Sequence, residues 1–438
     1  MTGAVAAGHP ASVRAGRSIL EQGGNAVDAA LGAVFAAFAA EGPLTGPAGG
    51  GFVLIRQPGC DPVFLDCFFT VPSTPRGEMD ELVIDFADSS AQVFHVGPES
   101  VAVPGLVHGL EEAHARFGRL RWGALFEPAL ELAAHGVEVG EAQSFLLSLL
   151  LPLLTRDPTG AHVYGTPGRL RTDVLLPALE LIRDEGSRSL PRLVPELASD
   201  LASYRPVERE AIRFGFRGLE VWTAPAPSIG GGVVRTMLEE LESARDESAL
   251  VDAVTRGYAG HHGTPRVTGT THVSVIDQAG LAVGISSTLG SGSGVFRSGF
   301  ELNNMLGELD VIGAVPREPG SRLPSMMAPT LALSNGVPRL VVGSAGSVRL
   351  AGAIAQVAWR VLALGMTVAE AIDAPRVHAD PGVTHLEGGW RGREPAGEVV
   401  RWAARNLFFG GVSAVAALPD GTLEAAGDPR RGGAGVVV

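Results

Sequence analysis

Apolar and polar positions near the start of the chain follow a helical pattern. Between residues 12 and 22 apolar side chains recur at helical spacing, and Gly23-Gly24 is a natural helix end. Asn25 is a suitable N-cap for a second helix over 26–40, which is apolar on nearly every side and rich in small residues. The pattern therefore predicts two successive helices, the second buried in the core.

Short apolar runs separated by Gly and Pro predict strands. The clearest case is a hairpin of 271–277 and 281–289, where polar and apolar residues alternate on either side of a turn at 278–280. Further strands are predicted at 51–56, 63–69, 211–214, 219–223, 331–333, 340–343 and 412–418. Helices are predicted over most of 105–185, in a segment that ends at 241, and over 349–364. A Gly/Pro loop is predicted at 156–171 and an exposed irregular segment at 242–269. Strand pairs that alternate with helical layers indicate sheets sandwiched between helices.

Composition narrows the range of functions. The chain has 438 residues, 45% of them hydrophobic and 18% charged, so it can bury a large core. Its net charge of −13 argues against nucleic acid and anionic membranes as partners. All 34 basic residues are arginine, which excludes mechanisms that need a lysine amine, such as Schiff-base chemistry. The longest uncharged apolar run, 29–40, is shorter than the roughly 20 residues of a membrane helix.

The cysteines and the N-terminus indicate a reducing location. Cys60 and Cys67 are too few for a disulfide scaffold or a cysteine-based zinc site. The first residues lack the basic flank and apolar core of a secretory signal, since the first arginine is Arg14. We therefore expect a cytoplasmic protein.

Several familiar catalytic patterns are missing from the sequence. It contains no G-x-S-x-G, G-x-G-x-x-G or H-E-x-x-H motif. His261, His262 and His272 have no acidic or cysteine partner at ligand spacing, so exposed or hydrogen-bonded histidines are favoured over a metal site. The glycine- and serine-rich run 290–294 is interpreted as a flexible or tightly turning active-site loop rather than an anion cradle, because no helix evidently follows it.

Eight short motifs, taken in order, carry more information than any one of them. They are Gly23 to Ala30, Gly49 to Phe52, Pro104-Gly105, Pro225 to Gly231, Thr270 to His272, Leu302 to Asn304, Ser325 to Thr330 and Asp373 to Arg376. In order and approximate position they resemble the γ-glutamyltransferase family, and the likeness covers nearly the whole chain. The chain is shorter than family members between about Glu185 and Ala202 and again before Thr270.

The resemblance implies an N-terminal-nucleophile hydrolase, with a four-layer α/β/β/α sandwich and a precursor that cuts itself. The new N-terminal residue would be Thr270, released by cleavage at Gly269–Thr270 into parts 1–269 and 270–438 that together form one structural domain. A free α-amine has a pKa of about 7.7–8.0, so on Thr270 it is a base beside the hydroxyl nucleophile. No metal or organic cofactor is then needed.

Further site residues follow from the resemblance. Thr288 matches a second threonine that hydrogen-bonds the first, although it is also ordinary strand sequence. The family stabilises the tetrahedral intermediate with the backbone N–H groups of a glycine pair, which here are Gly346 and Ser347. The serine keeps an N–H group, so we expect the oxyanion hole to persist.

The expected substrate pocket departs from the family. Phe68 occupies the place of the arginine that holds the substrate α-carboxylate, and a phenyl ring cannot replace a guanidinium. We consider Arg297 as a replacement. Other polar positions become Gly290, Met305 and Met326. The remaining polar positions are Ser325, which is kept, and Glu308, which stands where the family has an aspartate for the α-amine.

Three functions remain open. The leading one is a self-processing amide hydrolase or acyltransferase that transfers a γ-glutamyl-like group through Thr270 to water or an amine. The second is an acylase of the same fold that cleaves a less polar side-chain amide, as Phe68, Met305 and Met326 suggest. The third is a non-catalytic relative that binds a ligand or partner. We expect a small-molecule substrate, processed fragments that stay associated, and a homodimer as one oligomeric state to test.

Overall fold

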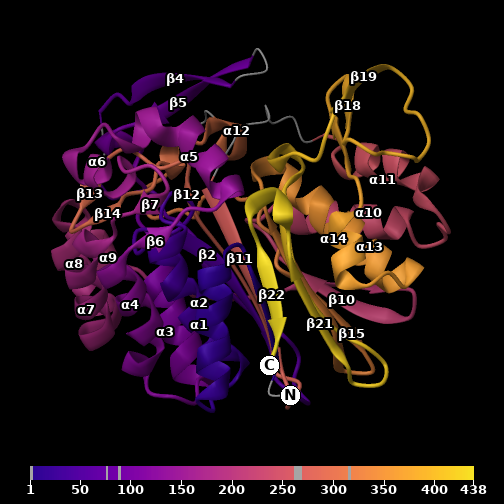
Figure 1. Ribbon diagram of the computed structural model, residues 1–438, viewed down its shortest axis with the longest axis horizontal. Coiled ribbons are helices and arrows are strands. Elements are labelled where there is room, and N and C mark those ends of the chain that lie inside the picture. Colours follow the sequence, from indigo (N-terminus) through magenta and orange to yellow (C-terminus); the bar gives the residue numbers. More distant parts are fainter. Residues whose placement is uncertain (1–2, 75–76, 87–89, 261–268, 314–316) are drawn as a thin grey trace.

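Two antiparallel sheets pack face to face in the centre of the protein. The computed structural model describes residues 3–74, 77–86, 90–260, 269–313 and 317–438. Helices cover the outer face of each sheet, so that the layers follow the order helix, sheet, sheet, helix (Figure 1). This arrangement confirms the predicted α/β/β/α sandwich.

The first sheet has seven strands, and the hairpin predicted from the alternating pattern lies at its centre. The strands run in the order β22 (Ala434–Val437), β1 (Gly3–Ala7), β11 (Gly269–Asp277), β12 (Ala282–Gly290), β2 (Gly50–Arg56), β3 (Val63–Cys67) and β8 (Val207–Arg209). Because every residue of β11 and β12 is buried, the hairpin is held from both faces of the sheet.

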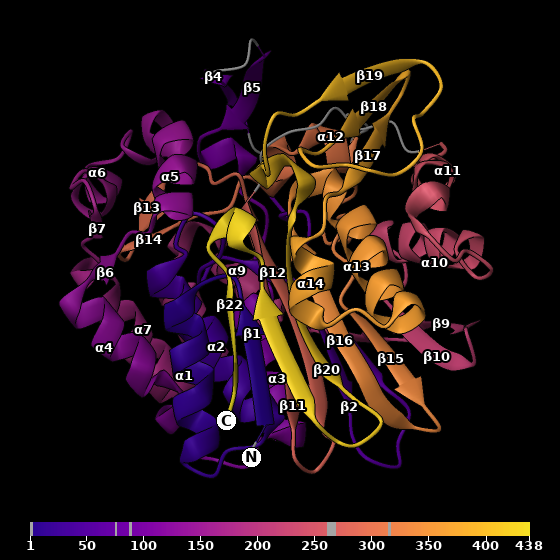
Figure 2. The same ribbon diagram turned by 45° about the vertical axis from the view of Figure 1, so that its right-hand side comes forward.

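The second sheet has six strands and packs on β11 through its central members. Its order is β21 (Leu423–Gly427), β20 (Gly411–Ala417), β16 (Val337–Ala345), β15 (Thr330–Ser334), β10 (Leu219–Thr223) and β9 (Ile212–Phe216). Both β16 and β20 contact β11. Figure 2 shows these strands side by side with those of the first sheet.

Two helical layers close the sandwich. The first sheet is covered chiefly by α1 (Pro10–Glu21), α2 (Ala26–Ala40) and α3 (Leu106–Phe117), with α4 (Glu127–His135) and α7 (Leu176–Glu185) packed near them. Around them lie α5 (Glu141–Leu154), α6 (Pro158–Tyr164), α8 (Leu190–Leu193) and α9 (Ala198–Ser203). The second layer comprises α10 (Gly230–Glu240), α11 (Leu250–Gly257), α13 (Leu350–Leu364) and α14 (Val368–Asp373).

Smaller elements lie outside the two sheets and the two helical layers. They are β4 (Asp80–Phe86) with β5 (Ser90–Val96), β6 (Val137–Glu138) with β7 (Arg169–Leu170), β13 (Phe296–Arg297) with β14 (Phe300–Glu301), the sheet of β17 (Val377–Asp380), β18 (Val383–Leu386) and β19 (Glu398–Arg401), and the short helix α12 (Leu309–Ile312).

Helix α2 is buried along its whole length, as its sequence predicted. All of its 15 residues are buried, and its small side chains let it lie close against β11 and β12. The predicted cap is present: the Asn25 side chain accepts the Asp28 N–H at 3.0 Å, and the Asp28 carboxylate accepts the Asn25 N–H at 3.0 Å. This helix therefore fixes the back of the strand that begins with Gly269.

Helix α13 is the other long apolar helix. The segment Ser347–Leu364 is apolar and long enough, by composition, to cross a membrane, but 78% of it is buried inside the protein. It packs on β16 and α10. We therefore assign this segment to the core of the second layer.

Two predicted irregular segments contain helices. Within the predicted loop 156–171, α6 starts at an Asp157 side chain that accepts the Thr159 N–H at 2.7 Å, with a proline at the first helical position. Within the segment predicted as irregular at 242–269, α11 buries Leu250 and Val254 against its neighbours. Both helices are short, so their periodicity was hidden by flanking Gly, Pro and polar residues.

Candidate active site

The predicted nucleophile is held at the start of a central strand. Thr270 is the second residue of β11 and is 3% exposed. The pairing of β11 with β12 places Thr270 opposite Thr288. Directly opposed residues of an antiparallel pair project to the same face of a sheet, so the two hydroxyl groups meet.

Hydrogen bonds connect the two threonines to the predicted cleavage site. The Thr270 hydroxyl donates to the Thr288 hydroxyl at 3.5 Å. The Thr288 hydroxyl donates in turn to the carbonyl oxygen of Gly269, and it accepts the N–H of Gly290 at 2.9 Å. Thr288 therefore polarises the carbonyl group that the Thr270 hydroxyl would attack in the precursor.

The peptide bond between Gly269 and Thr270 lies in an irregular part of the strand. The register of β11 against β12 shifts between these two residues. A Cβ on residue 269 would stand 2.5 Å from the Pro43 carbonyl oxygen and 2.7 Å from that of Gly290, which is too close for any side chain. Glycine is therefore required at this position for steric reasons.

Most predicted site residues line one pocket in front of Thr270. The pocket contains about 320 Å³ of space, including the part that is open to solvent. It is lined by Phe68, Thr270, Thr288, Gly290, Met305, Glu308, Val311, Ser325, Met326, Met327, Ser347 and Leu350. The structure thus brings the predicted substrate residues next to the predicted nucleophile, while the role of each stays a prediction.

The turn after β16 has the backbone conformation expected for a pair of glycines. Gly346 has φ +126°, and a Cβ there would stand 2.7 Å from the Cα of Gly410. Ser347 has φ +57°, a left-handed conformation that is uncommon for residues other than glycine. As the first residue of a 3-10 helix (Ser347–Arg349), it has an N–H group with no partner inside that helix. The backbone geometry is compatible with an oxyanion hole.

Phe68 belongs to an apolar wall of the pocket. It is 1% exposed and stacks on Phe52, with ring centroids 5.3 Å apart. Among the described residues that line the pocket there is no arginine. Arg322 donates to the Phe68 carbonyl oxygen at 2.6 Å. Its guanidinium is paired with the Asp66 carboxylate at 3.6 Å, and it does not line the pocket.

Arg297, the candidate considered as a replacement for the missing arginine, does not line the pocket around Thr270. The Arg297 Nε pairs with Glu196 at 2.9 Å. It lies in β13, part of a small separate hairpin, and its short distance from residue 294 along the chain does not bring it to the pocket.

The glycine- and serine-rich run after β12 is an ordered turn held by acidic and amide side chains. The Ser291 N–H donates to Asn304 at 2.7 Å and to Glu308 at 2.8 Å, and the Ser291 hydroxyl donates to Glu308 at 2.6 Å. Gly290 has φ +70°, which suits a tight turn. Glu308 thus supports the pocket wall as well as facing the pocket.

The predicted choice of hydrogen-bonded histidine over metal ligand fits His272. Its ring nitrogens lie 2.8 Å from the Ser286 hydroxyl and 2.9 Å from the Ser274 hydroxyl. Burial lowers the pKa of His272 to about 3, so the ring is neutral. His261 and His262 lie outside the described residues. Within the described ranges, no group of three or more His, Cys, Asp or Glu residues is placed to hold a metal ion.

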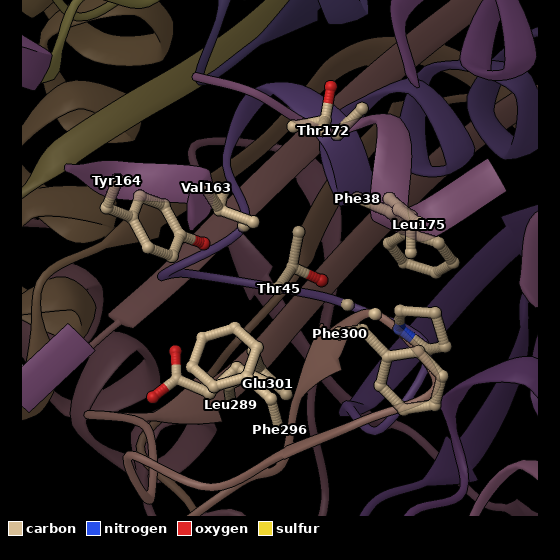
Figure 3. A pocket seen from close by; sticks show the side chains of 15 residues that line it. Phe38, Thr45, Val163, Tyr164, Thr172, Leu175, Leu289, Phe296, Phe300 and Glu301 are labelled. Atoms are coloured by element: carbon tan, nitrogen blue, oxygen red, sulfur yellow. The ribbon is translucent and has the colours of Figure 1, made fainter. Parts of the chain in front are cut away.

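Sequence analysis did not identify Glu301, whose carboxyl group lies beneath the glycine turn. It is 3% exposed, and one of its oxygens accepts the Gly294 N–H at 3.0 Å. It faces a largely apolar cavity, where Figure 3 shows the carboxyl group on the same side as the Tyr164 ring. Burial raises the pKa of Glu301 to about 8. Nothing in the local sequence distinguishes this glutamate from an exposed one.

Comparison with known proteins places the chain in a family. A family model described as gamma-glutamyltranspeptidase matches residues 12–183 and 241–438. The chain belongs to the γ-glutamyltranspeptidase family. The unmatched stretch, 184–240, includes the first of the two regions predicted to be shortened, at about 185–202. Membership supports an enzyme of the hydrolase and transferase class.

Individual relatives include both acylases and glutathione hydrolases. The chain is 30% identical to the acylase ACY 1 proenzyme of Pseudomonas sp. strain SE83, over all of this chain and 93% of that protein. It is 29% identical to the glutathione hydrolase proenzyme of Pseudomonas aeruginosa, over 86% and 82% of the two chains. Both are named proenzymes, which agrees with a precursor that is processed.

A solved structure confirms the fold. The crystal structure of a cephalosporin acylase from Bacillus halodurans superposes with a TM-score of 0.81, covering 99% of this chain and 95% of the other. The two sequences share 20% identity, so the likeness establishes the fold of the family and not the substrate.

The first prediction concerns cleavage at Gly269–Thr270. The purified protein should run as two fragments on a denaturing gel, and Thr270→Ala should remain a single chain, because the attacking hydroxyl is absent. N-terminal sequencing of the smaller fragment should begin at Thr270. A different first residue would show that the nucleophile is assigned incorrectly.

The second prediction concerns Thr288. Thr288→Ala should slow cleavage roughly 2- to 13-fold, since a hydrogen bond is worth about 0.5–1.5 kcal/mol. Thr288→Ser keeps the hydroxyl and should restore the rate, which is measured by following the full-length band with time. Equal slowing by both variants would point to packing rather than to the hydrogen bond.

The third prediction concerns Glu301 and pH. Its pKa is raised above an ordinary value of 4.5, so the folded state binds more protons, and its contribution to stability should fall as pH rises from about 4.5 to about 8. Glu301→Gln should lessen this fall, by a few kcal/mol at most, since one pKa unit is about 1.4 kcal/mol. Urea unfolding at pH 5 and pH 8, in the single-chain Thr270→Ala background, measures the change in the free energy of unfolding between the two pH values. The exposed Glu210→Gln is the control, and an unchanged slope in Glu301→Gln would refute the assignment.

Proposed function

We propose that the chain is a self-processing amide hydrolase and acyltransferase in which Thr270 carries the acyl group as an ester. In the precursor, the Thr270 hydroxyl attacks the Gly269 carbonyl carbon, and the bond between that carbon and the Thr270 nitrogen breaks, which frees the Thr270 amine and leaves an ester. Water then hydrolyses the ester to give the Gly269 carboxylate and the free Thr270 hydroxyl. In the mature enzyme this amine takes the hydroxyl proton as the hydroxyl attacks a substrate amide. Support comes from the hydrogen-bonded arrangement of Thr270, Thr288 and Gly269.

The acyl group that this pocket suits best carries no carboxylate that must be bound by an arginine. Phe68, Met305 and Met326 supply apolar contacts, and no described lining residue supplies a guanidinium. An unpaired carboxylate in such a pocket would lose its hydration without a compensating charge. The observation that carries this proposal is the stacked, buried position of Phe68. The substrate class is therefore a less polar side-chain amide.

A γ-glutamyl-like donor is the second candidate. Ser325 and Glu308 remain at the pocket and could hold a substrate α-amine, as the resemblance implies. Glu308 accepts two hydrogen bonds from Ser291, which hold its carboxylate at the pocket. The two candidates share the Thr270 ester and differ in the acyl group. A cytoplasmic location remains part of this proposal.

The fourth prediction separates the two donors. A γ-glutamyl p-nitroanilide should be hydrolysed no better than the same compound with its α-carboxylate capped as a carboxamide, because Phe68 offers the carboxylate no charge. Phe68→Arg should shift the preference toward the free acid by about 1.5–3 kcal/mol, the range for hydrogen bonds to charged groups. Phe68→Leu is the matched apolar control, and kcat/KM is measured for each pair.

Two results would contradict this proposal in different ways. A strong preference of the unchanged protein for the free acid would restore the γ-glutamyl candidate. A purified protein that neither cleaves itself nor hydrolyses any donor would be the non-catalytic relative.

A further inference from the structure

A tyrosine at the end of α11 reaches the turn that carries the expected oxyanion donors. Tyr258 follows the last residue of α11 and is 7% exposed. Its hydroxyl donates to the Val348 carbonyl oxygen at 2.8 Å and accepts the Gly352 N–H at 2.9 Å. Val348 belongs to residues 346–349, the oxyanion turn, and Gly352 lies in the first turn of α13. The hydroxyl therefore joins the oxyanion turn to the helix that follows it.

This hydroxyl is inserted where a regular helix would have a backbone hydrogen bond. In an α-helix the N–H of residue 352 would donate to the carbonyl oxygen of residue 348, four positions earlier. Here the Tyr258 hydroxyl bridges these two groups, and α13 begins only at Leu350. A side chain inserted between such groups bends or opens a helix at that point. The insertion therefore sets the oxyanion turn apart from the regular helix.

The backbone of the oxyanion turn is strained at the position of an expected donor. Ser347 has φ +57°, in the left-handed region. A residue other than glycine keeps this conformation only where its surroundings hold it. The Tyr258 hydroxyl holds the carbonyl group of Val348, which is the next residue along the chain. The tyrosine is therefore placed to keep the turn in this conformation.

The tyrosine side chain is itself held in place. Its ring lies edge-to-face against the ring of His378, with centroids 4.8 Å apart, and His378 is hydrogen-bonded to Asp380 at 3.0 Å. A Cβ on Gly352 would stand 3.0 Å from the Tyr258 hydroxyl, so glycine leaves the room that the hydroxyl needs. Burial raises the pKa of Tyr258, so the hydroxyl keeps the proton that it donates. Both the ring and the hydroxyl are thus fixed by their neighbours.

We propose that Tyr258 is a positioning residue for the oxyanion turn, whose inserted hydroxyl keeps the Gly346 and Ser347 N–H groups in the orientation that the oxyanion needs. The proposal rests on the proposed function. The tyrosine touches neither the substrate nor Thr270, and it acts through the backbone of the turn. Because Tyr258 belongs to 1–269 and the turn to 270–438, its two hydrogen bonds also join the two parts of the processed protein.

Cleavage of the precursor and turnover of a substrate should depend differently on this residue. During cleavage the negative charge develops on the Gly269 carbonyl oxygen, which accepts the Thr288 hydroxyl. During turnover the charge develops on the substrate carbonyl oxygen, for which the oxyanion turn supplies the expected donors. Loss of the Tyr258 hydroxyl should therefore slow turnover and leave cleavage unchanged. General damage to the fold would slow both.

The test compares Tyr258→Phe with the unchanged protein, using whichever of the γ-glutamyl p-nitroanilide and its carboxamide the unchanged protein hydrolyses faster. We expect kcat and kcat/KM to fall alike, about 10- to 100-fold, because the misplaced donors act only in the transition state. The time course of the full-length band should be unchanged. Tyr164→Phe is the matched control: Tyr164 is also buried, does not line the pocket around Thr270, and its loss of a hydroxyl should leave kcat unchanged.

A second variant disturbs the same contact from the other side. Gly352→Ala should press on the Tyr258 hydroxyl and lower kcat, although alanine favours a helix more than glycine does. Gly232→Ala, in α10, is its control, because a Cβ there would meet no atom within 4 Å. This pair decides the question if Tyr258→Phe does not fold.

The outcomes separate the inference from the proposed function. Unchanged kcat in a folded, processed Tyr258→Phe protein overturns the inference and leaves the proposed function intact. Equal slowing of cleavage and turnover, or an equal fall in kcat in Tyr164→Phe, assigns the effect to a general loss of stability and also overturns the inference. If the unchanged protein cleaves neither itself nor any donor, the proposed function fails, and the inference fails with it.

Discussion

The pairing of β11 with β12 is the constraint on which the rest of the site depends. It sets Thr270 opposite Thr288 and puts the Thr288 hydroxyl within reach of the Gly269 carbonyl. A one-residue slip would turn each side chain to the opposite face of the sheet. Burial of all nine residues of each strand makes such a slip costly, because apolar side chains on both faces would have to move into new environments.

Close approach of backbone segments explains why small residues gather around the nucleophile. Gly269 and Gly346 both lie where a Cβ would overlap neighbouring backbone atoms. Ser347, in contrast, keeps a left-handed conformation that a glycine would adopt at lower cost. Its hydroxyl is buried and makes no hydrogen bond to the described residues. The strain at Ser347 is therefore held by the packing of the turn between β16 and α13.

Sequence patterns predicted the parts of the structure that depend on local order. The central hairpin and α2 follow from alternation and capping, and the set of residues around Thr270 follows from motif order. The edge strand β22 and its neighbour β1 were missed, because each is a short run rich in Gly, Ala and Val that becomes a strand only through its pairing partners. Glu301 was missed for a related reason: its burial comes from contacts with residues distant in sequence.

The apolar wall of the pocket in front of Thr270 bears on how such an enzyme would choose its acyl group. On the acyl side, Phe68 replaces a charge with an apolar ring, and a hydrophobic pocket distinguishes similar groups by only about 1–3 kcal/mol. A polar clamp would discriminate more strongly, because a substrate that lacks the matching group leaves buried hydrogen-bonding groups unpaired. With Phe68 in place of such a clamp, the proposed enzyme would select acyl groups by apolar contact rather than by charge.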